Sequence, residues 1–176
     1  LGMGITVTAD YLILALLAVP ALGQLGVPLI AAHLVVFWFS QSSNVTPPVC
    51  MSAFAGAGIA GAQPYQTGFH AMKFSSFLYL MPFMFVYTPM LMPDGFNADV
   101  AYTWAMLFLA AIPYGAGMIG FLIARLSTWE RVVLVAAGCA MAFPGHFSDA
   151  VGAVMFLAVL GRQWAARRRS QLRPAR

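Results

Sequence analysis

Uncharged polar side chains interrupt an apolar stretch at residues 40–48, where the sequence reads SQSSNVTPP. Ser43, Asn44 and Thr46 offer neutral oxygen donors, which are the ligands that a small hard cation prefers. The two prolines lack a backbone N–H and push the preceding residues out of the helical conformation, which frees backbone carbonyls as further ligands. The segment therefore predicts a cation site at a break in a helix. The structural alternative is a proline kink whose hydroxyls bond neighbouring helices.

A second polar turn lies at the start of the chain, where residues 1–10 read LGMGITVTAD. The apolar run that follows, residues 11–23, would cover only about 20 Å of a ~30 Å hydrocarbon core as a helix. Because this run is half a span, we expect the turn with Thr6 and Thr8 to lie at membrane depth and to share an ion with the break. The alternative is a surface loop. Asp10 could add a charge to this site or cap the following helix.

The elements that hold these turns must be membrane helices. The chain has 176 residues, of which 61% are hydrophobic and 8% charged, whereas soluble domains have about 25% charged residues. The net charge of +4 arises mainly from arginines in residues 162–176. A basic run that directly follows an apolar helix is typical of a cytoplasmic anchor, so we expect an integral membrane protein that does not bind nucleic acid.

The other residues that could carry chemistry give weaker signals. His33 lies in an apolar run and is more typical of a hydrogen-bonded core residue than of a ligand. Cys50 and Cys139 have no metal-binding or CxxC spacing, so we expect small core residues. No paired acid, base or nucleophile is evident, so we expect no enzyme and no cofactor. An intramembrane enzyme and a structural membrane subunit remain the alternatives to a transporter.

Apolar runs and breakers divide the chain into helices. We expect one broken helix over residues 27–61, a polar bend over 62–73, and full spans over 74–92 and 101–124. Ser127 and Glu130 have the spacing of a capping box, which predicts a helix from about Thr128 to Phe143. A last helix is expected from Ser148 to Gly161. The predicted units are residues 1–73, the two spans of 74–124, a short helical hairpin of 125–161, and a basic cytoplasmic tail of 162–176.

The distribution of charge predicts a topology. If the broken helix runs inward, Lys73, Arg125, Arg131 and the tail all lie on the cytoplasmic side, and the loop with Asp94 and Asp99 lies outside. An excess of Lys and Arg on the cytoplasmic side is the usual pattern in membrane proteins.

Several segments resemble a known transporter family. The runs GMGITVTADYLILALLAVPAL, LGVPLIAAHLVVFWFS, SSNVTPPVCMSAFAGAGIAGAQPYQTGFHAMKF and FMFVYTPML, with STWERVVLV and FPGHFSD near the end, are similar to the C-terminal part of the large permease of tripartite ATP-independent periplasmic (TRAP) transporters. The resemblance is strongest to fused permeases that work with TAXI-type binding proteins. It implies a multi-pass protein of the bacterial inner membrane whose C-terminus is cytoplasmic.

The resemblance also implies a fold and a mechanism. The expected fold is an all-α membrane protein, the C-terminal half of an elevator-type transporter with inverted repeats, holding a re-entrant hairpin tip and a broken helix. Such a permease imports an organic acid with sodium as the coupling ion. Its expected partners are a periplasmic substrate-binding protein and a small membrane subunit, separate or fused upstream, because the chain begins at Leu1 and resembles the C-terminal piece of a longer protein.

Carried onto this sequence, the resemblance assigns residues to two groups. The expected sodium ligands are Thr6, Thr8, Ser43, Asn44 and Thr46, with no other metal. The residues expected to contact the substrate are Gly4, Gln41, Ser42, Pro47 and Pro48. The sequence departs from the family pattern at the tip, where Thr6 replaces a common proline, Val7 a common threonine, and Asp10 a small residue.

Overall fold

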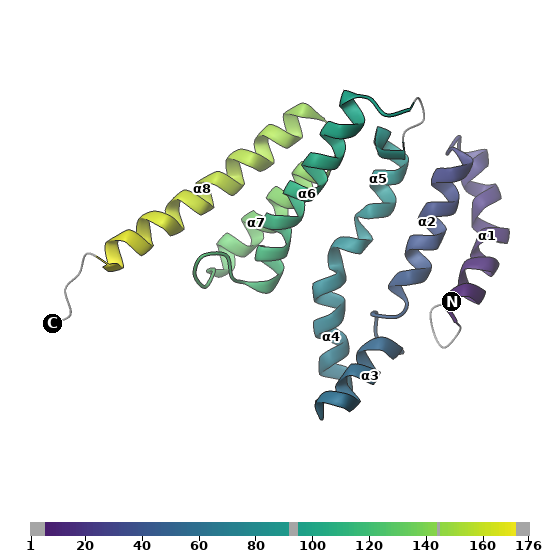
Figure 1. Cartoon of the computed structure of the whole chain (residues 1–176), viewed down its shortest axis with the longest axis horizontal. Helices are drawn as coiled ribbons and strands as arrows, with labels where there is room; N and C mark the ends of the chain where they lie inside the picture. Colours follow the sequence, from purple (N-terminus) through teal and green to yellow (C-terminus); the bar gives the residue numbers. More distant parts are fainter. Residues whose placement is uncertain (1–5, 92–94, 144, 172–176) are drawn as a thin grey trace. The chain divides into compact units, whose positions relative to one another are not determined.

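A computed structural model describes residues 6–91, 95–143 and 145–171, with side chains to residue 165. The named elements in these ranges are all helical, as expected (Figure 1). Three of the helical segments are long and apolar enough to cross a membrane, namely Val7–Gln24, Pro64–Tyr87 and Ala98–Ile119. The chain forms two compact units, one up to Val100 and one from Ala101 onward, which are described separately.

The first unit begins with an antiparallel helical hairpin of α1 (Val7–Gln24) and α2 (Leu29–Ser42). Thr6 caps α1, because its Oγ1 accepts a hydrogen bond from the N–H of Ala9 at 3.4 Å. Gly26, with φ +83°, turns the chain between the two helices. The prediction of a polar turn followed by a half-length helix is therefore wrong: the cap lets the helix begin before Thr8, and its 18 residues span about 27 Å.

Apolar residues hold the hairpin together. Val19 of α1 packs with Ala32 and Val36 of α2 in a buried cluster. Residues at helical spacing on α1 extend this contact, among them Leu14 and Leu22. The opposite side of α1 presents large apolar side chains such as Leu16 and Leu17 to the outside, which suits a helix that faces lipid or another apolar surface.

A non-helical segment separates α2 from α3 (Met51–Ala60), which confirms the predicted interruption of the helix before and at the two prolines. The break is shorter than predicted, because residues 40–42 still belong to α2. Helix α3 ends at Gly61 in the left-handed conformation, with φ +63°.

Residues 62–73 are not the predicted polar bend. Pro64 stands in the first turn of α4 (Pro64–Phe74), a position that suits proline because its missing N–H is not needed there. Helix α4 packs on α3 at Gly68, where a Cβ atom would lie 2.6 Å from Cys50 Sγ.

The path from α4 continues through η1 (Ser75–Tyr79), α5 (Met81–Tyr87) and η2 (Pro89–Leu91). The predicted span of 74–92 thus begins ten residues earlier, at Pro64, and is interrupted. Pro82 provides a reason for the interruption, because it cannot donate the hydrogen bond that a regular helix makes to the carbonyl of Leu78.

The second unit contains most of α6 (Ala98–Ile119), α7 (Thr128–Ala142) and α8 (His146–Gln171). Helix α6 begins three residues before the predicted 101 and ends five before 124, because Gly120 adopts φ +85°. The capping box is confirmed: Glu130 Oε2 accepts from the N–H and the hydroxyl of Ser127 at 2.8 and 2.9 Å. Helix α8 runs from His146 to Gln171, so the prediction that it ends at Gly161 is wrong.

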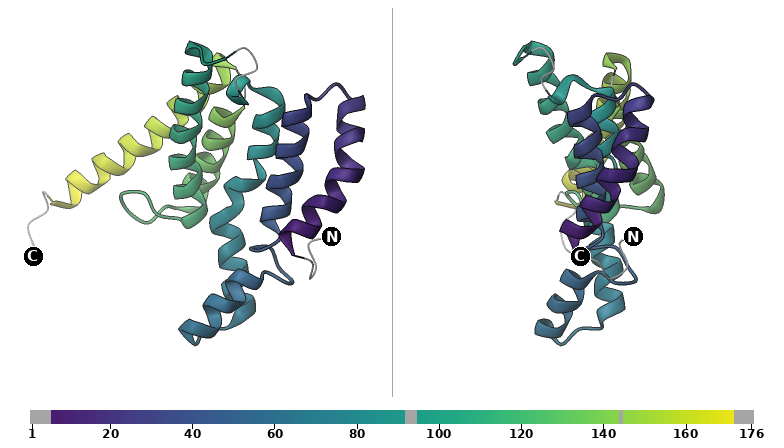
Figure 2. Two further views of the ribbon diagram at one scale, coloured as in Figure 1. Left: turned by 45° about the vertical axis from the view of Figure 1, so that its right-hand side comes forward. Right: turned by 90° about the vertical axis from the view of Figure 1, so that its right-hand side faces the viewer.

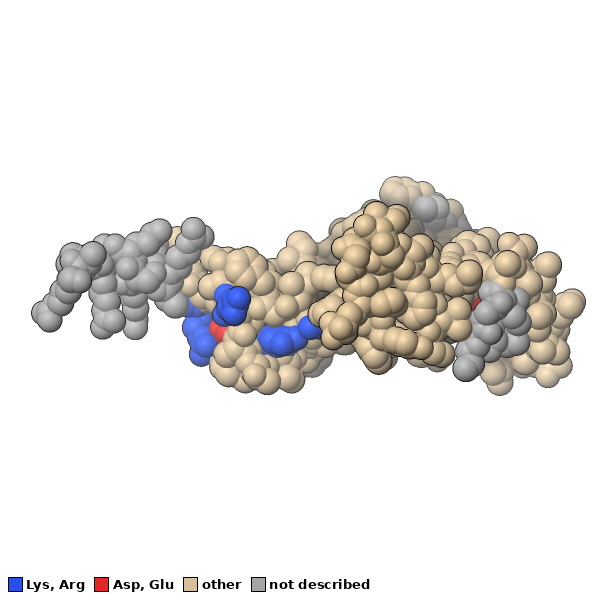
Figure 3. All heavy atoms as spheres, turned by 90° about the horizontal axis from the view of Figure 1, so that it is seen from below, with Lys and Arg blue, Asp and Glu red and all other residues tan. Residues whose placement is uncertain are grey.

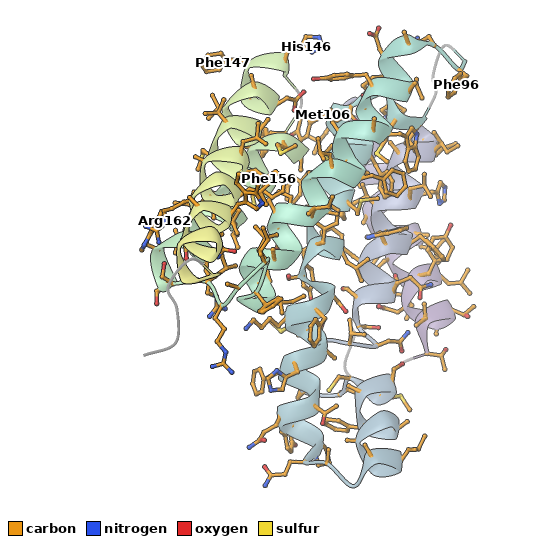
Figure 4. All side chains as sticks on the ribbon, turned by 60° about the vertical axis from the view of Figure 1, so that its left-hand side comes forward. Phe96, Met106, His146, Phe147, Phe156 and Arg162 are labelled. Carbon is orange, nitrogen blue, oxygen red and sulfur yellow. The ribbon has the colours of Figure 1, made fainter. Side chains whose placement is uncertain are left out.

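Close backbone approach binds α7 to its neighbours in this unit. A Cβ atom on Gly138 would lie 2.6 Å from Tyr114 Cβ, and one on Gly152 would lie 2.5 Å from Met141 Cγ. Phe156 packs against the apolar cluster formed with Leu134, whereas Phe147 points outward near the start of α8 (Figure 4). In the view from below, most of the visible surface of the described residues belongs to neither Lys, Arg, Asp nor Glu (Figure 3).

Candidate ion site at the break between α2 and α3

The break exposes backbone oxygens because of where its prolines stand. In a continuous helix, the carbonyls of Ser43 and Asn44 would accept hydrogen bonds from the N–H groups four residues later. Those positions are Pro47 and Pro48, which have no N–H, and the bond between them is cis. Among the described residues, nothing donates to either carbonyl. The carbonyl oxygens of two successive residues are therefore available to a ligand.

The hydroxyls around the break have partners in the protein. Ser42 Oγ donates to the carbonyl of Phe39 at 2.7 Å, and Ser43 Oγ donates to that of Ser40 at 2.7 Å. Thr46 Oγ1 donates to the carbonyl of Ser42 at 2.6 Å. The carbonyls of Ser40 and Ser42 also accept backbone N–H bonds, from Ser43 and Val45, so these hydroxyls add further bonds at the end of α2. Each hydroxyl oxygen retains a lone pair, so it can still face a cation.

The two amide side chains of the segment are the polar groups that remain open. Gln41 and Asn44 are half-buried, and neither side chain has a hydrogen-bond partner among the described residues. A half-buried amide oxygen without a protein partner is a suitable ligand for a cation or a donor-bearing substrate. Pro47 is half-buried and Pro48 exposed.

The start of α1 lies beside this break (Figures 1 and 2). Thr6 and Thr8 are both exposed there, and Thr6 Oγ1 serves as the helix cap. No hydrogen bond joins either threonine to the break in the described part of the chain. The two predicted groups of ligands thus stand at the start of α1 and at the break, and no hydrogen bond connects them in the described structure. Gly4, a predicted substrate residue, lies outside the described residues.

The electrostatic setting favours a cation at the end of α2. The C-terminal end of a helix carries a partial negative charge, and the break directly follows this end. Lys73 is the single Lys or Arg of the sequence between residues 6 and 91, and it stands in the last turn of α4. No group of three or more His, Cys, Asp or Glu in the described ranges could hold a metal ion.

One residue near the site was not predicted from the sequence. Tyr79 of η1 places its hydroxyl 2.5 Å from Thr46 Oγ1 and thereby ties the break to the next segment. Asp10, which the sequence offers as a charge at the site or as a helix cap, is 2% exposed, and Thr6 rather than Asp10 caps α1. The spacing of Asp10 from Leu14, one helical turn later on the face that packs against α2, could have indicated burial. His33, interpreted as a core residue, is half-buried and bonds the Tyr11 hydroxyl through Nδ1 at 2.9 Å.

Comparison with known proteins identifies the first half of the chain. Residues 1–96 match the family model described as tripartite ATP-independent periplasmic transporter, DctM component. No curated protein and no solved structure matches the chain. The matched range contains α1, the break and the segments that pack around it. The matched family is a transporter family rather than an enzyme family. The transporters of this family also comprise a periplasmic binding protein and a small subunit. The chain is therefore a membrane protein that belongs to the DctM component family of TRAP transporters.

Proposed function

We propose that this chain is part of a permease that imports organic acids together with sodium. The observation that carries the proposal is the pair of unpartnered carbonyls at Ser43 and Asn44, next to the half-buried amide of Asn44. Neutral oxygens in a water-poor setting coordinate a small alkali cation, and discontinuous membrane helices hold the ions of secondary transporters in this way. Thr6, Thr8, Ser43 and Thr46 complete the proposed set of sodium ligands.

The substrate site lies beside the ion in this proposal. Gln41 offers a half-buried amide without a protein partner, and Ser42 has a hydroxyl at the same end of α2. Gly4, Pro47 and Pro48 form the remaining proposed contact surface. An amide can donate two hydrogen bonds to a carboxylate, which suits an organic acid. A binding protein of the TAXI type delivers this acid, as the resemblance of the GMGITVTADY and SSNVTPPV segments suggests.

The proposed architecture is the C-terminal half of an inverted-repeat, elevator-type permease in the bacterial inner membrane. Its C-terminus is cytoplasmic, in agreement with the excess of Lys and Arg in the expected cytoplasmic segments. The proposed small membrane subunit is a separate chain or is fused upstream of this one.

Uptake into proteoliposomes that contain the assembled transporter tests the function. With the periplasmic binding protein outside and a labelled organic acid bound to it, an inward sodium gradient should drive accumulation. Replacement of sodium by choline at equal ionic strength should abolish it, and so should omission of the binding protein. Equal uptake in sodium and in choline would contradict sodium coupling, and uptake without the binding protein would contradict the proposed partner.

A further inference from the structure

Asp10 is a buried acidic residue in the first turn of α1. Its side chain is 2% exposed, and its Oδ1 atom is buried with no hydrogen-bond partner in the described structure. No ion pair joins it to a cationic side chain among the described residues. Removing a carboxylate from water is costly, and a protein offsets that cost with a counter-charge or with hydrogen bonds to both oxygens. The described residues therefore provide no counter-charge for the Asp10 carboxylate and no hydrogen bond to its Oδ1 atom.

The position of Asp10 in helix α1 does not compensate for its burial. It stands in the first turn, where the positive end of the helix dipole favours an acidic side chain. That effect is small compared with the desolvation of a buried charge. The Asp10 N–H is bonded to the carbonyl of Thr6, at 2.9 Å, and the Thr6 side chain already caps the N–H of Ala9. The cap thus functions without the Asp10 carboxylate.

The packing of the hairpin indicates where this carboxylate lies. Asp10 precedes Leu14 by one turn on α1, and Ser40 follows Val36 by one turn on α2. Because α1 and α2 are antiparallel and share the apolar cluster with Leu14 and Val36, Asp10 and Ser40 both stand at the polar end of this interface. Ser40 is fully buried. The break with its two free carbonyls begins three residues after Ser40.

We propose that the Asp10 carboxylate is the anionic ligand of a monovalent metal cation held between the start of α1 and the break after α2. This inference rests on the proposed function for the position of the ion. The carboxylate gives the cation a full negative charge, whereas the residues of the break supply neutral oxygens. The cation in turn supplies the counter-charge that the described residues do not. A sodium ion satisfies both requirements because carboxylate and carbonyl oxygens are hard ligands.

A binding experiment tests this site without relying on transport. The purified permease that contains this chain is heated in detergent at increasing NaCl, with choline chloride to keep the ionic strength constant. A ligand that binds the folded state raises the melting temperature in a saturable way. In the wild type, sodium should therefore stabilise the protein. In Asp10→Asn, the half-maximal sodium concentration should rise at least about tenfold, as expected for the loss of a charged ligand.

Asp149→Asn is the matched control. Asp149 is also buried, at 6% exposure, but its Oδ2 accepts a hydrogen bond from the Tyr102 hydroxyl at 2.7 Å. This variant should keep the wild-type sodium midpoint even if its melting temperature falls. If Asp10→Asn does not fold, Asp10→Glu keeps the charge and displaces the oxygens, so its sodium midpoint should rise as well.

Three outcomes would overturn the proposal. Equal sodium midpoints in the wild type and in the folded Asp10 variant would show that the carboxylate does not contact the ion. If Asp10→Asn removes a pH dependence of stability but leaves the sodium midpoint unchanged, Asp10 binds a proton instead. A wild type that choline and sodium stabilise equally would exclude the site. If Asp10-dependent sodium binding is found without sodium-driven uptake, the site stands and the proposed transport function fails.

Discussion

The hydroxyl of Thr46 lies 2.5 Å from the hydroxyl of Tyr79, which joins the break after α2 to the 3₁₀ segment η1. Because the Thr46 proton is directed to the carbonyl of Ser42, Tyr79 donates the proton of this bond. The bond connects residues 33 positions apart, so it fixes the break against a segment that follows it in the fold. It also occupies one lone pair of Thr46, which leaves Thr46 less available to a ligand than Asn44.

Tyr79→Phe should therefore lower stability by a small amount. The change removes one hydrogen bond and keeps the ring, so we expect a loss of about 0.5–1.5 kcal/mol in the free energy of unfolding. The measurement is the unfolding equilibrium in detergent micelles. Tyr87→Phe is the control, because Tyr87 is 65% exposed and has no hydrogen-bond partner in the described structure. Equal losses in the two variants would show that the bond to Thr46 does not hold the break.

Asn44→Ala tests the proposed ion ligands in uptake. If the amide oxygen coordinates sodium, its loss should weaken sodium binding by about 1.5–3 kcal/mol, which is about 10- to 150-fold in the sodium concentration for half-maximal uptake. The backbone carbonyls of Ser43 and Asn44 remain, so residual coupling is expected. Gln63→Ala removes an exposed amide outside the break and should leave the sodium dependence unchanged. An unchanged sodium midpoint in Asn44→Ala would remove this side chain from the ion site.

Cysteine labelling tests the predicted topology. Phe96 is 73% exposed in the loop before α6, and a cysteine there should react with an impermeant thiol reagent added from outside. The neighbouring Asn97 is less suitable because its side chain caps α6 through the N–H of Val100, at 2.9 Å. A cysteine at Ala165 of α8 should react only after the membrane is permeabilised. Cys50 and Cys139 are replaced by alanine in both variants, and the reverse labelling pattern would invert the topology.

The start of α7 should respond to acid through Glu130. Burial raises the pKa of this carboxyl, but hydrogen bonds from Ser127 and the charge of Arg162, whose Nη2 lies 3.1 Å from Glu130 Oε1, outweigh burial and lower it below its ordinary value. Because the pKa of Glu130 is lower in the folded chain, its ionisation stabilises the fold at pH values above the pKa of glutamate in the unfolded chain, about 4.3. This stabilisation is lost as the pH falls through the pKa of Glu130 in the folded chain.

We therefore expect the melting temperature of the wild type to fall more steeply below about pH 4 than that of Glu130→Gln. Above about pH 5, Glu130→Gln should be the less stable protein, because it loses the carboxylate that caps α7 and pairs with Arg162. Parallel pH curves for the two proteins would mean that Glu130 ionises alike in the folded and unfolded chains.

The sequence alone determined the features that depend on residue type and spacing. Pro47 and Pro48 cannot donate the hydrogen bonds that a continuous helix needs, so the break after α2 was predictable from chemistry local to it. The capping box of Ser127 and Glu130 is equally local, since both its bonds lie within one helical turn. The scarcity of charge identified a membrane protein in the same way.

Only the tertiary structure decided which polar groups have partners. Asp10 reads as part of a polar turn, but the hairpin packing of α1 on α2 buries it on the face of Leu14, and burial depends on residues far along the chain. Tyr79 reaches Thr46 because the chain turns back through α3, α4 and η1 to the break, a contact that no local pattern contains. The sequence also predicted a bend at residues 62–73 and a tail after 161, where the structure has most of α4 and the last part of α8. Polar and basic residues are compatible with both loops and helices, so packing and length decide between the two.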